Sequence, residues 1–458
     1  MSFHRSLFNS LLDWKSRERR KPLILRGARQ VGKTTLVNQL GETYKHRIFL
    51  NLERRKDLSY FEMEDVSLIL ERLFLENGIS LSSISETLLF IDEIQESPKA
   101  IHLLRYFYEE FPELPVIAAG SLLEFAIHQV KSFPVGRVEF LYLYPLNFPE
   151  FLKALKLDLL HEQIQKVPIS KAAHHILLEK FHEYAIIGGM PEIVKEYSVS
   201  KSITELPRVY ESIWGNYKND VEKYANNETD RKVIKHIINT AHAYIDQRIK
   251  FQNFGNSTYR SREVGEAFRS LTDAKVIQII YPTTNVQPPT ISDVKKSPRL
   301  QFLDTGILNH SLNIQGQMLG KSDLCDTFNG AIIPHLVTQE LQSLNKLSSY
   351  PPQFWVREKR QSSAEVDLIY TYQDKVIPIE IKSGSKGTLK SLHQFIERAG
   401  HPYAIRLYAG EFKIEKAKTN SGYEFFLMNL PYYLGTKIPE YVKLFVENDI
   451  NQFDNVSI

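Results

Sequence analysis

Cysteine is nearly absent from this chain: Cys325 is the only one among 458 residues. A single thiol excludes an internal disulfide framework and a zinc site built on cysteines, and it is typical of the reducing cytosol. Long apolar runs are missing as well, since none approaches the ~18 residues that a membrane-spanning helix needs. The segment 1–21 has no uninterrupted apolar stretch of the kind found in signal peptides. We therefore expect a cytoplasmic protein with no membrane partner.

An excess of one charge is also missing. Lysine and arginine number 57 against 54 aspartate and glutamate residues, which gives a formal net charge of +3. So small an excess does not by itself point to nucleic acid. Apolar residues make up 43% of the chain and charged residues 24%, which is an ordinary globular composition. The length suits about two to four domains.

A P-loop for a nucleoside triphosphate is the strongest pattern in the chain. Residues 23–25 predict a buried strand, which enters a loop with the spacing G-x-x-x-x-G-K-[ST] and then a helix. The glycines let backbone N–H groups surround phosphate oxygens, and the helix adds its positive N-terminal dipole. We expect Lys33 to reach the β- and γ-phosphates and the Thr34 hydroxyl to ligate Mg²⁺. The predicted nucleotide-contacting residues of the loop are Gly27, Ala28, Arg29, Gln30, Val31, Gly32, Lys33, Thr34 and Thr35.

An acidic pair after a second apolar strand completes the predicted site. Residues 88–91 are apolar, and Asp92 and Glu93 follow directly. A P-loop enzyme needs an acid at the end of a neighbouring parallel strand to hold the Mg²⁺ shell, and Asp92 fits this role. The adjacent Glu93 is the natural base that orients and polarises the attacking water. Acids also follow strands at the start of ordinary loops, but the Asp-Glu order after a P-loop favours the catalytic interpretation.

Further apolar stretches at 47–52, 115–121 and 138–143 alternate with helical sequence. This alternation predicts a parallel α/β sheet with right-handed crossovers. Ser121 has two open interpretations, because it either senses the γ-phosphate or water, or caps the next helix. Arg137 is either an arginine finger for the nucleotide of a neighbouring subunit or an ordinary surface arginine. A finger supplied in trans would imply a homo-oligomer.

The middle of the chain is predicted to be helical. Helical periodicity over 149–197 ends at the glycines of 188–191, and amphipathic helices continue over 201–250. From 257 to 281 a helix followed by a strand suits a winged-helix module. The segment 255–300 contains seven basic and four acidic residues. This excess is compatible with DNA contact, but a winged helix that only packs domains together explains it equally well.

A second group of charged residues lies on a predicted hairpin near the C-terminus. If Gln373 and Asp374 form a two-residue loop, Asp367 and Glu380 face each other across the ladder, with Cβ atoms ~4.5–5.5 Å apart. Lys382 comes two residues after Glu380 and therefore shares its face. Two carboxylates and a lysine on one face can hold a divalent metal and activate a water against a phosphate.

Other features bear on this predicted metal site. Glu340, on a preceding helical segment, is a candidate for a third oxygen ligand. The alternative is an amphipathic hairpin whose charged face is only solvated, which is a common arrangement. Opposed like charges cost stability and disfavour that alternative, whereas Pro378 cannot donate to a ladder and warns of irregular pairing.

Together, these motifs resemble a family of prokaryotic AAA-type P-loop ATPases that carry a C-terminal nuclease-like domain of the PD-(D/E)XK type. The similar segments span nearly the whole chain and are 27–34, 89–93, 119–121, 136–137, 144–146, 188–191, 302–306, 365–367 and 379–384. The resemblance implies a RecA-like core with strand order 5-1-4-3-2, a helical lid, a winged helix and a nuclease-like α/β domain. It also implies that Arg137 contacts nucleotide and that Gln394 belongs to a late nuclease motif. The literal Pro-Asp is absent, because Val366 precedes Asp367.

The sequence and the resemblance lead to one prediction. The fold class is α/β, with an ATPase core at 1–150, a helical lid at 151–200, a helical and winged-helix region at 201–315 and a nuclease-like domain at 316–458. The core binds ATP and Mg²⁺ and hydrolyses the nucleotide. This activity is coupled to DNA binding, or to DNA cleavage with Mg²⁺ or Mn²⁺ by Asp367, Glu380 and Lys382. The alternative is a nucleotide-gated switch that binds DNA or another partner and does not cut.

Overall fold

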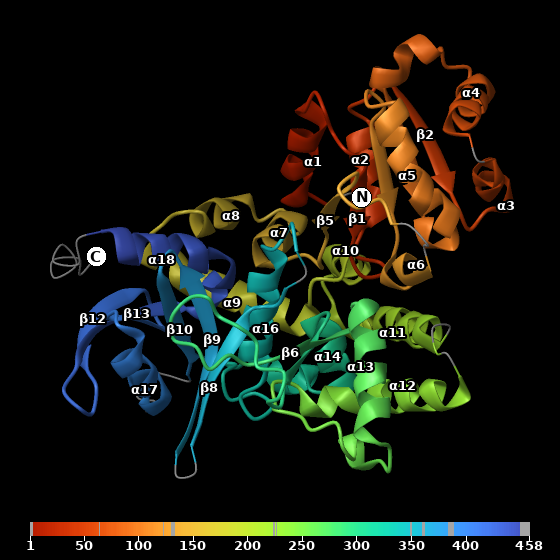
Figure 1. The fold of residues 1–458 in the computed structure, drawn as a ribbon. Coiled ribbons are helices and arrows are strands. Elements are labelled where there is room, and N and C mark those ends of the chain that lie inside the picture. The colour runs from red at the N-terminus through yellow and green to blue at the C-terminus, as the bar shows by residue number, and fades with distance from the viewer. Residues whose placement is uncertain are drawn as a thin grey trace. The chain divides into compact units, whose positions relative to one another are not determined.

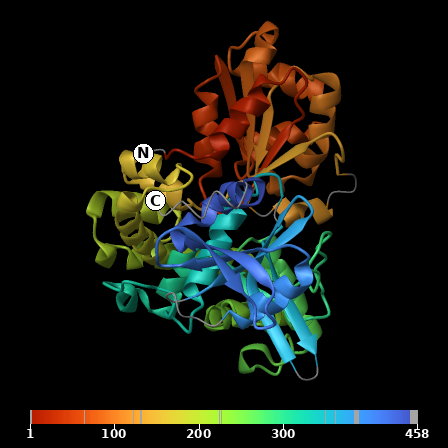
Figure 2. The ribbon, with the colours of Figure 1, turned by 90° about the vertical axis from the view of Figure 1, so that its left-hand side faces the viewer.

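The computed structural model describes residues 3–63, 65–121, 123–129, 133–222, 225, 227–348, 350–359, 362–382 and 389–448 (Figure 1). The chain separates into two compact units. The first contains 1–145 together with the short segments 273–276 and 345–349, and the second contains 146–272, 277–344 and 350–458. Each unit has its own β-sheet, which the red-to-orange and the cyan-to-blue arrows of Figure 2 mark.

A five-stranded parallel sheet forms the centre of the first unit. Its strands are β1 (Leu23–Arg26), β2 (His46–Asn51), β3 (Thr87–Asp92), β4 (Val116–Ala119) and β5 (Glu139–Tyr142). They lie in the order β2-β3-β4-β1-β5 and all pair in parallel. Every residue of β3 and β4 is buried, as expected for strands covered on both faces of a parallel sheet. The predicted strand order, 5-1-4-3-2, is confirmed.

Helices connect these strands, and local sequence explains where two of them begin. They are α1 (Leu7–Ser16), α2 (Lys33–Gly41), α3 (Arg55–Leu58), α4 (Val66–Glu76), α5 (Pro98–Glu110) and α6 (Leu123–Gln129). The Asp65 side chain caps α4 by accepting hydrogen bonds from the Ser67 and Leu68 N–H groups. Ser97 caps α5, which starts with a proline. Proline lacks a backbone N–H, but the first residue of a helix has no carbonyl within the helix to which it could donate.

Two short segments from later in the chain also belong to the first unit. The Tyr142 N–H at the end of β5 donates to the Lys346 carbonyl at 2.9 Å. Lys275 Nζ lies 3.4 Å from a carboxylate oxygen of Glu124 on α6. Both segments lie outside the continuous range 1–150 that we predicted for the ATPase core.

The second unit begins with helices and contains a small two-stranded sheet. Its helices are α7 (Phe148–Ala154), α8 (Asp158–Ile164), α9 (Lys171–Ile187), α10 (Pro191–Ser200), α11 (Pro207–Glu222), α12 (Glu228–Thr240), α13 (Ser261–Asp273), α14 (Thr305–Leu312), α15 (Gln315–Met318), α16 (Ile332–Ser343), α17 (Lys390–Ala399) and α18 (Ile438–Glu447). Strands β6 (Ile277–Ile280) and β7 (Arg299–Phe302) pair antiparallel. The predicted helix and strand over 257–281 are therefore present, and the winged-helix assignment stays a prediction.

A mixed six-stranded sheet completes the second unit. Its strands are β8 (Gln353–Lys359), β9 (Ser362–Tyr372), β10 (Lys375–Ile381), β11 (Tyr403–Tyr408), β12 (Lys413–Lys418) and β13 (Glu424–Pro431). They lie in the order β12-β13-β11-β10-β9-β8. Helix α17 packs on this sheet, where the Phe395 ring meets the Trp355 ring edge-on at 5.1 Å between centroids. The fold is thus α/β in both units, and the nuclease-like assignment stays a prediction.

Close backbone contacts explain the glycines of two motifs that the sequence showed far apart. The Gly189 N–H donates to Asp304 Oδ2 at 2.6 Å, and the Ile307 N–H donates to Asp304 Oδ1 at 3.0 Å. A Cβ on Gly306 would lie 2.0 Å from the Ile187 carbonyl oxygen. Only glycine permits such an approach. Segments 188–191 and 302–306 therefore form one buried structural contact in the second unit.

Candidate functional site

The P-loop lies between β1 and α2, as predicted. Gly32 caps α2 with a left-handed backbone, φ 97°, which glycine adopts without strain. A Cβ on Gly27 would lie 2.3 Å from the Leu143 carbonyl oxygen. The start of the loop therefore packs directly against the backbone at Leu143, and only glycine fits there. Lys33 Nζ donates to the Gly27 and Ala28 carbonyls at 3.0 and 2.8 Å. Burial lowers the pKa of Lys33 to about 8, although Glu93 and Asp92 act in the opposite direction.

A hydrogen bond joins the P-loop to the end of β3. The Thr34 hydroxyl donates to Asp92 Oδ2 at 2.7 Å. Asp92 is 4% exposed, and burial raises its pKa while the Thr34 hydrogen bond opposes the rise. A hydroxyl and a carboxylate in contact beside a phosphate-binding loop are the two protein ligands that a Mg²⁺–nucleotide needs. The residues present therefore fit Mg²⁺ and a nucleoside triphosphate.

Glu93 follows Asp92 and turns the chain away from the strand. Its backbone is left-handed, with φ 52° and ψ 43°. Its carboxylate accepts a hydrogen bond from Gln95 Nε2 at 2.6 Å. Glu93 was predicted from the residue pattern, whereas Gln95 was not.

The predicted hairpin is present in the second unit, with the predicted register. Lys375 pairs with Tyr372, and the ladder continues without interruption to Ile379 and Leu368, past Pro378. The next pair in this register is Asp367 and Glu380. There, the Asp367 side chain itself accepts the Ile381 N–H, through Oδ2 at 2.8 Å. Residues 383–384 of the motif lie outside the described residues.

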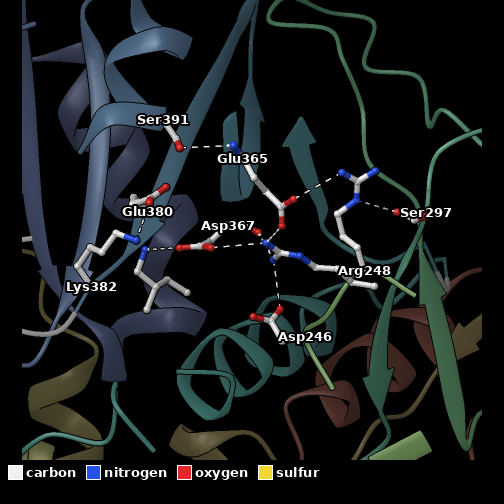
Figure 3. Close-up of polar contacts among 10 residues, drawn as sticks. Asp246, Arg248, Ser297, Glu365, Asp367, Glu380, Lys382 and Ser391 are labelled. Carbon is white, nitrogen blue, oxygen red and sulfur yellow. Dashed lines mark hydrogen bonds and ion pairs between the residues drawn. The ribbon is translucent and has the colours of Figure 1, made fainter. Parts of the chain in front are cut away.

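An arginine from β7, Arg299, contacts the carboxylates of Asp246, Glu365 and Asp367, which Figure 3 labels. Arg299 Nη1 donates to Asp246 Oδ1 at 3.2 Å, and Nη2 lies 3.6 Å from Asp367 Oδ1. The same guanidinium donates to Glu365 and lies over the Phe354 ring, 4.4 Å from its centroid. Its side chain is 9% exposed. Burial alone would lower the pKa of Arg299, but the surrounding carboxylates raise it above its ordinary value.

Glu380 is in a different position from Asp367. Its Oε1 contacts Lys382 Nζ at 2.9 Å, and its side chain is 4% exposed. Its Oε2 is buried and has no hydrogen-bond partner among the residues that the structure describes. Burial, together with Asp367, raises the pKa of Glu380. The structure thus brings Asp367, Glu380 and Lys382 together, as predicted from the register.

This carboxylate pair does not fit a divalent cation as it stands. Asp367 has one oxygen engaged by a backbone N–H and the other facing Arg299. Within the part of the chain that the structure describes, no three histidine, cysteine or acidic side chains gather in a way that could hold a metal ion. A cation at Asp367 would have to compete with the Arg299 guanidinium.

Comparisons with known proteins find a family of described type for the first unit, and domains of unknown function for the second. Residues 19–152 match the AAA domain family. Residues 178–318 and 329–433 match two domains of unknown function, DUF8612 and DUF4143. An uncharacterized protein of Methanocaldococcus jannaschii, MJ1637, is 24% identical over 405 residues, which cover 82% of this chain and 79% of the relative. The Walker-type ATPase PABY2304 of Pyrococcus abyssi aligns with a TM-score of 0.44 and 15% identity, over 68% of this chain and 96% of that one.

The first unit thus contains a P-loop within a segment that is similar to AAA domains. None of the described helices of the whole chain is long and apolar enough to cross a membrane. In the first unit, Ser121 is buried just after β4, two residues before α6 begins. Arg137 is 43% exposed and pairs with Glu109 at 2.8 Å. Neither position decides between the open interpretations, and both nucleotide contacts stay predictions.

One residue that supports the P-loop was missed by the sequence analysis. Arg5 is 6% exposed, and its Nη1 donates to the Val31 carbonyl in the loop at 2.9 Å. Its other terminal nitrogen donates to the Tyr144 carbonyl. A charged residue just before an apolar helix carries no motif, so only the tertiary contact identifies it.

Glu340, the expected third metal ligand, has a structural role instead. Its two oxygens accept the Phe148 N–H at 3.0 and 3.1 Å, and Oε1 also accepts the Tyr184 hydroxyl at 2.8 Å. The side chain is fully buried and joins α16 to α7 and α9. Both oxygens are engaged by these groups, so we do not assign Glu340 to a metal site.

Replacement of Glu340 by glutamine is expected to flatten the pH dependence of stability. Burial raises the pKa of Glu340 from its ordinary 4.5 to about 8. The folded state therefore holds a proton that the unfolded state loses, and the free energy of unfolding falls as pH rises from 4.5 to about 8. The slope reaches ~1.4 kcal/mol per pH unit, and glutamine removes this contribution. Urea unfolding of both proteins across this range measures it, and equal slopes would contradict the prediction.

Proposed function

We propose that this protein binds ATP with Mg²⁺ and hydrolyses it at the P-loop of its AAA domain. The observation that supports this most directly is the 2.7 Å hydrogen bond from Thr34 to Asp92, because it joins the two residues that we expect to ligate Mg²⁺. Lys33 lies in the loop beside them, and Glu93 follows Asp92. ATP is chosen over other nucleotides because of the similarity to AAA domains.

The residues of the site have separate tasks in this reaction. Lys33 and the loop N–H groups bind the phosphates and hold them in line. Glu93 accepts a proton as the water oxygen bonds to the γ-phosphorus and the bond to the β–γ bridging oxygen breaks. When bound, Mg²⁺ supplies positive charge to the β- and γ-phosphate oxygens. The products are ADP and inorganic phosphate.

Turnover of ATP by the purified full chain with Mg²⁺ tests this proposal. We expect Lys33→Ala to abolish turnover, because the ammonium that reaches the phosphates is lost. Lys45→Ala is a matched control, since this lysine is 61% exposed and pairs with Glu86 at 2.9 Å. Turnover that survives Lys33→Ala, or is absent from the folded wild type, would overturn the proposal.

For the second unit, we propose nucleotide-gated binding of DNA or another partner, without cleavage, as a further candidate function. Arg299, which already neutralises the carboxylates around Asp367, supports the absence of cleavage. Cleavage of DNA is the competing candidate, favoured by Glu380 Oε2, which lies beside Asp367 and accepts no hydrogen bond from the described part of the chain.

A cleavage assay separates the two candidates. Plasmid and single-stranded DNA are incubated with the full chain and Mg²⁺ or Mn²⁺, with and without ATP. Gating without cleavage predicts that the affinity for DNA depends on ATP and that no DNA is cut. It also predicts that Glu380→Ala leaves the affinity for DNA unchanged. Scission by the wild type that disappears in Glu380→Ala would establish cleavage and overturn the candidate without it. Affinity that ignores ATP would overturn the gate.

A further inference from the structure

Gln95 connects Glu93 to the neighbouring strand. It lies in the 3₁₀ turn η3 (Ile94–Glu96), directly after β3 and Glu93. Its Nε2 donates to Glu93 Oε2 at 2.6 Å. Its Oε1 is buried and accepts no hydrogen bond from the described residues. The orientation of the amide follows from chemistry, because the opposite orientation would place a carbonyl oxygen against a carboxylate.

The buried carbonyl oxygen of Gln95 lowers the stability of the fold, because no described group donates a hydrogen bond to it. A buried acceptor without a donor costs free energy and in a native structure calls for an explanation. Within the described parts of the chain, the amide has one hydrogen-bond partner, and it is the predicted catalytic base. Holding Glu93 is therefore the gain for which the unpaired carbonyl is tolerated.

Gly120, at the end of β4, makes room for this amide. A Cβ at Gly120 would lie 2.3 Å from Gln95 Oε1 and 3.5 Å from its Cδ. Gly120 is not among the glycines with positive φ, so the backbone conformation there does not require glycine. The space does. Strands β3 and β4 are neighbours, and Gly120 directly precedes Ser121, so the Gln95 amide lies between two strand ends that face the nucleotide site.

The backbone of Glu93 also needs this support. A non-glycine residue in the left-handed region, here with φ 52°, persists when its surroundings fix it. The Glu93 N–H donates to Asp92 Oδ1 at 3.1 Å, and Gln95 holds the side chain. Backbone and carboxylate are thus both fixed.

We propose that Gln95 is a positioning residue for ATP hydrolysis, which holds the Glu93 carboxylate in the place where it takes the proton of the attacking water. This inference rests on the proposed function and adds a residue to it. Gln95 exchanges no proton and forms no bond with the nucleotide. Its contribution is therefore to kcat, and the KM for ATP does not depend on it.

Steady-state ATP hydrolysis by the full chain tests this role with four variants. Gln95→Ala removes the amide, and Gln95→Glu keeps its size but replaces the donor with a second carboxylate. We expect both to lower kcat by up to about 100-fold with little change in KM, because a displaced base is far less effective. Gly120→Ala is expected to lower kcat as well, since the new Cβ would push the amide away from Glu93. Glu96→Gln, an exposed position in the same turn, is the control and should resemble the wild type.

The double variant Gln95→Ala/Gly120→Ala distinguishes positioning from general damage. If Gly120 acts through the amide, its replacement adds less than about twofold to the loss in Gln95→Ala. Losses that multiply would overturn the link through Gly120, and a kcat within about twofold of the wild type in both Gln95 variants would overturn the whole inference. Absence of turnover in the wild type and in Lys33→Ala alike would overturn the proposed function, and this inference with it.

Discussion

Replacement of Arg299 by glutamine is expected to lower the free energy of unfolding by about 3–5 kcal/mol. The guanidinium is 9% exposed and compensates Asp246 and Glu365, which are 20% and 31% exposed. Burial raises the pKa of Asp246 to about 7 even with the arginine present. Without Arg299, several carboxylates would lose their nearest counter-charge, and Arg248, whose Nη1 lies 4.0 Å from Glu365 Oε2, would remain.

The midpoint of urea unfolding of the full chain measures this effect. Arg406→Gln is a matched control from the same unit, because that side chain is 4% exposed but lies 3.5 Å from Glu415, which is 37% exposed. We expect a smaller loss there, since Glu415 is better solvated. Adding Asp246→Asn to Arg299→Gln should restore part of the stability. Equal losses in the two arginine variants, or no restoration, would contradict this account.

Replacement of Glu93 by glutamine is expected to lower the kcat for ATP hydrolysis by about 10²- to 10⁴-fold. Glutamine keeps the size of the side chain but cannot accept a proton at neutral pH. Lys33, Thr34 and Asp92 are unchanged, so the variant should still bind ATP with Mg²⁺. Phosphate release measures the first property, and calorimetric titration with ATP measures the second.

Glu86→Gln is the matched control for this variant. Glu86 is 51% exposed and immediately precedes β3, whereas Glu93 follows its end, so the two replacements test the same chemistry on one strand. We expect wild-type turnover from Glu86→Gln. A Glu93→Gln protein that retains turnover would remove Glu93 from the proposed mechanism, and one that no longer binds ATP would give it a role in the fold.

Local sequence patterns predicted the features that depend on neighbours along the chain. The P-loop spacing located the turn before α2, and the apolar run before Asp92 located β3. The two-residue loop at Gln373 fixed the hairpin register, because antiparallel pairs follow once the turn is known. The strand order of the first unit came from the resemblance and not from the periodicity of the residues.

Contacts between distant segments could not be predicted in this way. In the sequence, Arg299 was one of seven basic residues whose excess is compatible with DNA contact. In the structure, it contacts two acidic residues of β9. Glu340 was expected at a metal site, and it instead receives a helix N–H and a tyrosine hydroxyl. The Gln95 contact is local, but its meaning depends on Gly120, which directly follows another strand, β4.

The sequence by itself determined that this chain contains a phosphate-binding loop and a strand that ends in two acids, because both depend on residue types at fixed spacing. Only the tertiary structure decided which charges compensate one another. The free energy of a buried carboxylate depends on its solvation and on the cations within a few ångströms, and these come from segments that the sequence separates widely. For this reason, Asp92 could be placed from the sequence, whereas Asp367 received its partner, Arg299, only through folding.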